Sequence, residues 1–201
     1  KNQEWHPSEM VSISIGQGYN TYTPLQMAHA TATLANNGVV YRPHVVKELH
    51  NHQTQEITLV DPKPERTLPF KQSNFDYVKK GMEGVLRPGG TGWRVGSGLQ
   101  YTMGGKTGTA QVKSIAQGKS YNAAALAVQH RDHAWFISFA PVDKPKIAIA
   151  VILENGGWGA TAAPVARQLT DFYLLKILGQ GSSNELSTPQ GMTVLGDEAL
   201  V

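Results

Sequence analysis

Residues 147–153 are apolar at every position, and this run constrains the fold more than any other part of the chain. In a strand, alternate side chains point to opposite faces of the sheet, so both faces of this run are apolar. It should therefore form a central strand that is covered on both sides. Residues 134–140 are also largely apolar, and the turn-forming segment 141–145 between the two runs predicts an antiparallel hairpin.

Three segments have the apolar spacing of helices that could cover the faces of such a sheet. Residues 23–37 open with Thr23, a good N-cap, and Pro24, which fits the first helical position. Gln26, three positions after the threonine, completes a capping box. Residues 73–86 and 161–178 place apolar side chains on one helical face. Each segment should therefore fold as a helix with one face against the core.

Shorter extended segments complete the predicted fold. Residues 39–49 and 56–60 are predicted strands of a second hairpin, and residues 101–112 are a strand candidate rich in threonine and glycine. Residues 61–72 are interrupted by prolines and are predicted to be a loop. The sum is an α+β fold, an antiparallel sheet with helices packed on its faces.

The end of the chain differs from the rest. Residues 180–201 contain glycine, serine and glutamate without any periodicity, and we expect them to form a mobile C-terminal tail. Residues 1–179 show no internal repeat and are long enough for one domain of ordinary size.

Composition excludes several classes of protein. Hydrophobic residues make up 40% of the 201 residues and charged residues 16%, which is a globular composition. The net charge of +3 is not gathered into a basic patch, so no nucleic acid partner is expected. There is no cysteine, and the histidine pairs His50/His52 and His130/His133 lack a third ligand nearby, so no metal site is predicted.

The tripeptide Lys106-Thr107-Gly108 is the segment that most suggests chemistry. Two glycines precede it and Thr109 follows it, and glycines remove side chains from a strand that a ligand backbone could then approach closely. A lysine and two threonine hydroxyls on one short strand would form a cationic, hydrogen-bonding rail for a carboxylate. The alternative interpretation is a structural lysine exposed on an edge strand.

Lys106-Thr107-Gly108 and its strand resemble the third sequence motif of penicillin-binding proteins and serine β-lactamases. The resemblance covers about residues 5–178 and is nearest to the monofunctional, class B enzymes of cell elongation in Gram-negative bacteria. It implies that residues 1–179 are the C-terminal part of a penicillin-binding/β-lactamase-like transpeptidase domain. The other segments that carry it are Ser14-Ile15-Gly16-Gln17-Gly18-Tyr19, Thr23-Pro24-Leu25-Gln26-Met27-Ala28, Arg131-Asp132-His133-Ala134-Trp135-Phe136 and Ile152-Leu153-Glu154-Asn155-Gly156-Gly157.

The resemblance implies a penicillin-sensitive peptidoglycan D,D-transpeptidase, which cross-links stem peptides through a serine acyl-enzyme. It makes Lys106, Thr107 and Gly108 catalytic, and Thr107 and Thr109 substrate-binding. It also makes the backbone N–H of Thr109 one of two donors to the oxyanion. Neither a cofactor nor a metal is implied.

The same resemblance implies partners and a location. The partners are peptidoglycan stem peptides, β-lactam antibiotics and a membrane-embedded glycan polymerase of the elongation machinery. The location is the periplasmic face of the bacterial inner membrane, with the anchor in an upstream segment.

The sequence departs from the family pattern in its first two motifs. Ser-x-x-Lys, which carries the nucleophile, does not occur among the 201 residues. Ser-x-Asn occurs as Ser120-Tyr121-Asn122 and Ser182-Ser183-Asn184, but both follow Lys106, whereas the family places this motif before the third. We therefore expect an upstream part of the same domain to supply both motifs, and the 201 residues alone to be inactive.

Two alternatives stay open at this point. One is a related hydrolase, a D,D-carboxypeptidase or a β-lactamase, that uses the same third motif. The other is a non-catalytic domain that keeps the fold without the nucleophile.

Overall fold

The computed structural model describes residues 5–7, 9–113 and 121–179. Its centre is a three-stranded antiparallel sheet with the strand order β5–β6–β7. The strands are β5 (Gly104–Ala110), β6 (His133–Ala140) and β7 (Ile147–Leu153). All of these predicted strands are confirmed, as is the hairpin that joins β6 to β7.

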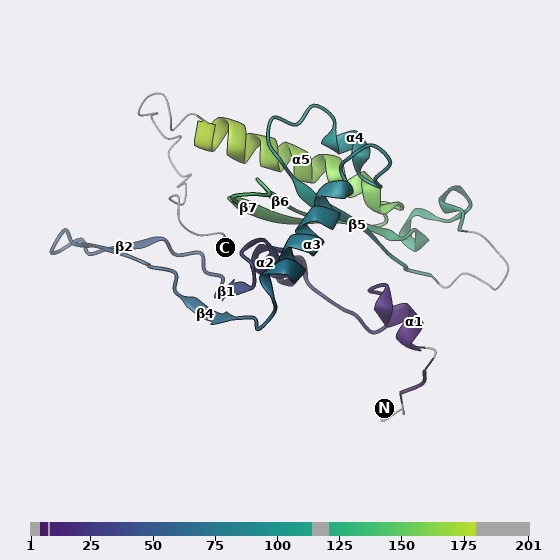
Figure 1. Ribbon diagram of the computed structural model, residues 1–201, viewed down its shortest axis with the longest axis horizontal. Coiled ribbons are helices and arrows are strands. Elements are labelled where there is room, and N and C mark those ends of the chain that lie inside the picture. The colour runs from purple at the N-terminus through teal and green to yellow at the C-terminus, as the bar shows by residue number, and fades with distance from the viewer. Residues whose placement is uncertain (1–4, 8, 114–120, 180–201) are drawn as a thin grey trace.

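Helices cover both faces of this sheet, as Figure 1 shows. α2 (Pro24–Ala35) packs on β6 and β7, α3 (Gln72–Gly84) packs on β5, and α5 (Ala163–Asp171) lies on the opposite face. Side chains alternate along β6, so Phe136 joins the apolar cluster on the α5 side and Phe139 joins the cluster against α2 and α3. The predicted α+β fold is confirmed.

The start of α2 has the capping box that its sequence predicts. The N–H of Gln26 donates to the hydroxyl of Thr23 at 3.2 Å, and the N–H of Thr23 donates to the side-chain carbonyl of Gln26 at 2.9 Å. Such a cap stabilises a helix by roughly 1 kcal/mol. It therefore fixes where the helix that covers β6 and β7 begins.

The prediction that residues 147–153 form the central strand is wrong for the described residues. β6 lies in the middle, and β7 is an edge strand of this sheet. Both faces of β7 are nevertheless covered, by α2 and α5. An apolar run on both faces reports what lies above and below a strand, and it carries no information about how many strands pair with it in the plane.

A second region forms two antiparallel ribbons that project from the body in Figure 1. β2 (Glu48–His50) and β3 (Ile57–Leu59) form the predicted hairpin, whereas β1 (Val39–Tyr41) is separated from β2 by irregular chain. β4 (Pro64–Thr67) pairs with β1, although its proline-containing sequence predicts a loop. Pro64 is the first residue of β4, a position where a strand tolerates a missing N–H.

The remaining elements are short. They are α1 (Glu9–Ser14), α4 (Trp93–Gly96), and the 3₁₀ turns η1 (Ala123–Ala125), η2 (Val128–His130) and η3 (Gly159–Ala162). The predicted helix over residues 161–178 is confirmed as the end of η3, α5 and the π-helical η4 (Phe172–Leu178). The predicted tail, residues 180–201, lies outside the described residues. Within the described ranges, no helix combines the length and the apolarity needed to cross a bilayer.

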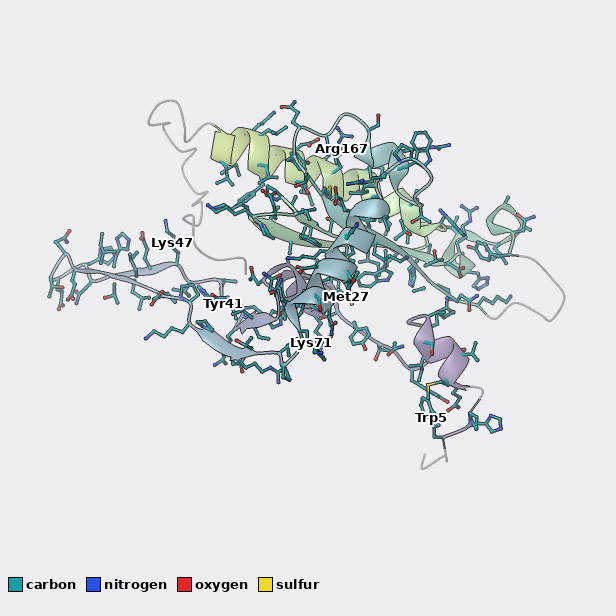
Figure 2. The ribbon with its side chains drawn as sticks, in the orientation of Figure 1. Trp5, Met27, Tyr41, Lys47, Lys71 and Arg167 are labelled. Carbon is teal, nitrogen blue, oxygen red and sulfur yellow. The ribbon has the colours of Figure 1, made fainter. Side chains whose placement is uncertain are left out.

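Arg167 on α5 holds the segment that leads into β5. Its guanidinium donates to the carbonyls of Val95 at 2.8 Å and Ser97 at 2.5 Å, and its Nε lies 3.3 Å from Oδ2 of Asp171. In Figure 2 the labelled side chain lies where α5 faces the α4 segment. Charge-assisted bonds to several carbonyls fix this segment, and so the start of β5, against the helix.

Candidate active site

The side chains of the Lys-Thr-Gly strand are divided between the two faces of the sheet. Residues directly opposite each other in an antiparallel pair share a face, and Lys106 is paired with Ile137 while Thr107 is paired with Phe136. Lys106 therefore lies on the α2/α3 side, and Thr107 and Thr109 lie on the α5 side. Strand alternation thus places the side chains of Lys106 and of the two threonines on opposite faces, although the ammonium of Lys106 reaches the carbonyl of Thr107.

The outer edge of β5 carries backbone groups that point away from β6. The side-chain amide of Gln17 donates to the carbonyl of Thr109 at 3.4 Å, and the ammonium of Lys106 donates to the carbonyl of Thr107 at 2.8 Å. The N–H and C=O of one residue point to the same side of an antiparallel strand. The N–H of Thr109 therefore faces the open edge too, where no strand among the described residues pairs with β5.

Each of the two threonine hydroxyls has a partner from a distant part of the chain. The hydroxyl oxygens of Thr107 and Thr91 lie 2.9 Å apart. The N–H of Gly159, at the start of η3, donates to the hydroxyl of Thr109 at 3.1 Å. The two hydroxyls are half-buried and lie beside each other on the α5 face.

Gly159 can make this bond because it has no side chain. A β-carbon at position 159 would collide with the backbone of Gly108, including its carbonyl oxygen. The backbone of η3 therefore lies directly on β5, and any larger residue would push the two apart.

The glycines before Lys106 serve packing within the sheet, contrary to their predicted role in ligand approach. A β-carbon on Gly104 would lie 2.8 Å from the ring of Phe139, and one on Gly105 would lie 2.5 Å from the ring of Phe136. Both glycines are buried. They leave room for the two phenylalanines of β6, which are the largest fully buried side chains among the described residues.

The far end of β5 is held by Asp132, which is 4% exposed. Its carboxylate accepts from the N–H of Val112 at 3.1 Å, and its own N–H donates to the hydroxyl of Tyr121 at 3.0 Å. Tyr121 thus supports the strand, while Ser120 and the Ser182-Ser183-Asn184 segment lie outside the described residues. His133 likewise has a structural partner, because its Nδ1 accepts from the N–H of Asn155 at 2.8 Å.

Sequence reasoning located the strand and missed three residues that surround it, namely Gln17, Thr91 and Gly159. Gln17 lies within a segment that carries the family resemblance, but nothing in the pattern relates it to Thr109, 92 positions away. Thr91 lies between two glycines, which signal a tight loop without showing where that loop packs.

The comparison with known families agrees with this geometry. A family model described as "Penicillin binding protein transpeptidase domain" matches residues 1–171. The chain belongs to this family. The peptidoglycan D,D-transpeptidase MrdA of Acinetobacter baumannii is 46% identical to this transpeptidase-domain chain over 177 residues, which cover 87% of the chain and 26% of MrdA.

Solved transpeptidases have the same fold. PBP2 of Pseudomonas aeruginosa, in complex with WCK 5153, gives a TM-score of 0.68 at 37% identity, over 95% of this chain and 38% of PBP2. Penicillin-binding protein A of M. tuberculosis, as a penicillin G acyl-enzyme complex, gives 0.62 at 29% identity, over 81% and 34%. The predicted family is confirmed, and its relatives include enzymes named MrdA and PBP2. The transpeptidase-domain chain spans about a quarter of the length of the curated relative from A. baumannii.

Proposed function

We propose that this chain is the part of a peptidoglycan D,D-transpeptidase that binds the substrate carboxylate and supplies one of the two hydrogen-bond donors to the oxyanion. The observation that carries the proposal is the outer edge of β5. There the N–H of Thr109 faces an open side, with the hydroxyls of Thr107 and Thr109 on one face of the strand and Lys106 on the other. These are the groups needed to hold a tetrahedral oxyanion and a carboxylate.

The reaction has two steps. A serine hydroxyl attacks the carbonyl between the two terminal D-alanines of a stem peptide, an ester forms, the peptide bond breaks, and the leaving D-alanine takes the proton. The amine of a second stem peptide then attacks the ester, a new amide forms, the ester bond to the serine breaks, and the serine oxygen takes the proton that the amine loses. The serine belongs to a Ser-x-x-Lys motif outside these 201 residues.

Each residue of the third motif has its own task in this scheme. The hydroxyls of Thr107 and Thr109 donate hydrogen bonds to the C-terminal carboxylate of the donor peptide. The N–H of Thr109 donates a hydrogen bond to the oxyanion. Gly108 supplies the stretch of backbone on which Gly159 lies. Lys106, which is exposed, adds a positive charge to the outer edge of β5 from the other face.

The relatives favour a transpeptidase over a hydrolase or a non-catalytic domain. The curated relatives are named D,D-transpeptidases, and one structural relative is a penicillin G acyl-enzyme. A β-lactam would therefore acylate the same serine and remain attached. From the family resemblance we further propose that the site acts at the periplasmic face of the inner membrane, beside a glycan polymerase embedded in that membrane.

The test uses the complete domain, meaning these 201 residues joined to the segment that carries Ser-x-x-Lys. Intact mass after incubation with benzylpenicillin should show one adduct per complete domain, on the serine of that motif, and none on the 201 residues alone. Slow release of the adduct is expected for a transpeptidase. Failure of the complete domain to react, rapid release of the adduct, or an adduct on any serine of these 201 residues would contradict the proposal.

A further inference from the structure

Thr91 contacts Thr107, one of the two proposed carboxylate-binding residues, and lies in a segment that neither the motif nor the proposed function includes. It precedes β5 by more than ten residues, and its hydroxyl oxygen lies 2.9 Å from that of Thr107. We propose that Thr91 is a positioning residue that makes Thr107 a hydrogen-bond donor to the substrate carboxylate. This inference rests on the proposed function.

Thr109 shows the arrangement that Thr91 would complete. A backbone N–H can only donate, so the hydroxyl oxygen of Thr109 must accept from Gly159. The single hydrogen of the Thr109 hydroxyl is then free to point at a ligand. One side of this hydroxyl is used within the protein, and the other is left for the substrate.

The pair formed by Thr91 and Thr107 has two possible directions, since either hydroxyl could donate. A carboxylate only accepts hydrogen bonds, so a bound carboxylate selects the direction in which Thr107 donates to it. Thr107 then accepts from Thr91, as Thr109 accepts from Gly159. Thr107 and Thr109 thus each accept a hydrogen bond from another part of the protein and donate one to the substrate carboxylate. Since chains of hydrogen bonds polarise one another, the bond from Thr91 also strengthens the one from Thr107 to the carboxylate.

The loop that carries Thr91 is folded tightly against the end of α3. The N–H of Gly90 donates to the carbonyl of Arg87 at 2.9 Å, and the N–H of Gly92 donates to the carbonyl of Val85 at 3.0 Å. A β-carbon on Gly90 would collide with that carbonyl of Val85. The backbone on both sides of Thr91 is therefore fixed. Its side chain is exposed to solvent, and its hydroxyl contacts Thr107 of β5.

The experiment compares two ligands that differ only in the carboxylate. In the complete domain, the second-order rate of acylation is measured with benzylpenicillin and with its methyl ester, for wild type, Thr91→Ala, Thr91→Val and Thr91→Ser. The Ala and Val variants should react with the free acid about 3- to 10-fold more slowly, as expected for one neutral hydrogen bond. Their rates with the ester should match wild type, and Thr91→Ser should restore the rate with the acid.

A double-mutant cycle tests whether Thr91 acts through Thr107. In the Thr107→Ala background, Thr91→Ala should cost nothing further, because the hydroxyl it would orient is gone. Thr58→Ala, an exposed threonine on the β2–β3 hairpin, is the matched control and should leave both rates unchanged.

The outcomes separate this inference from the proposed function. Equal loss with the acid and the ester, full additivity with Thr107→Ala, or no rescue by Thr91→Ser overturns the role of Thr91 alone. If the Ala variant melts early, Thr91→Val, which keeps the branched shape, decides the question. A wild-type complete domain that does not react with benzylpenicillin overturns the proposed function instead.

Discussion

The backbone N–H of Gly159 donates a hydrogen bond of 3.1 Å to the hydroxyl of Thr109, which precedes it by 50 residues. This bond joins η3 to the Lys-Thr-Gly strand, and it exists because a glycine can lie directly on the backbone of Gly108. The side-chain chemistry of Thr109 therefore depends on a residue that has no side chain.

Replacing Gly159 should disturb both the fold and the site. In Gly159→Ala, the added methyl group meets the carbonyl of Gly108, so η3 must move away from β5. We expect the free energy of unfolding of the complete domain to fall by about 1–3 kcal/mol. Acylation by benzylpenicillin should slow on the order of 10-fold or more, because Thr109 loses its support. Gly84→Ala is the matched control, since a β-carbon there meets no atom within 4 Å.

Lys106 should affect the reaction without affecting stability. Its side chain is exposed, and its ammonium donates a hydrogen bond to the carbonyl of Thr107 on the same strand. Lys106→Ala should slow acylation about 10- to 100-fold, as for the loss of one hydrogen bond to a charged group, while the melting temperature of the complete domain stays the same. Lys63→Ala, also exposed, should change neither. A parallel loss of stability and rate would favour a purely structural lysine.

Thr109 allows its backbone and side-chain roles to be separated. Thr109→Ala keeps the N–H and removes the proposed carboxylate contact together with the bond from Gly159. Thr109→Pro also removes the N–H, which faces the open edge, so no bond of the β5–β6 ladder is lost. The Pro variant should therefore acylate about 10²–10³-fold more slowly than the Ala variant, as for the loss of one oxyanion donor.

Circular dichroism must first show that the Thr109→Pro variant folds. If a folded Pro variant reacts as fast as Thr109→Ala, the N–H of Thr109 does not bind the oxyanion.

Tyr101 should make stability depend on pH in alkali. Burial, and then the hydrogen bond of 2.6 Å from its hydroxyl to Asp171, raise the pKa of Tyr101 above its usual value. The folded state thus favours the protonated phenol. The stabilisation that follows is complete at pH values below the pKa of about 10 in the unfolded chain, and it is lost as the pH rises through the higher pKa of the folded state. In denaturant titrations of the complete domain from about pH 9 to 12, Tyr101→Phe should lose less stability than wild type. Tyr77→Phe, an exposed tyrosine, should follow wild type.

Local patterns in the sequence were sufficient for much of the fold. The capping box at Thr23, the strand over residues 147–153 and the hairpin before it depend only on residues that are close in sequence. All three form, although the strand lies at the edge of the sheet and not at its centre. The Lys-Thr-Gly motif likewise located the strand and the family. These features are determined locally, because helix caps and strand alternation depend on neighbours along the chain.

The arrangement around the strand was decided only by the tertiary structure. β6, rather than β7, lies in the middle of the described sheet; β4 pairs with β1 although it begins with a proline; and Lys106 lies on the opposite face from the threonines. Thr91 and Gly159 meet the two hydroxyls from separate loops. The physical reason is that strand neighbours and loop contacts join residues far apart in sequence, so they depend on how the whole chain packs. The sequence by itself therefore determined which chemical groups the strand carries, and the tertiary structure decided which of them face outward and what supports them.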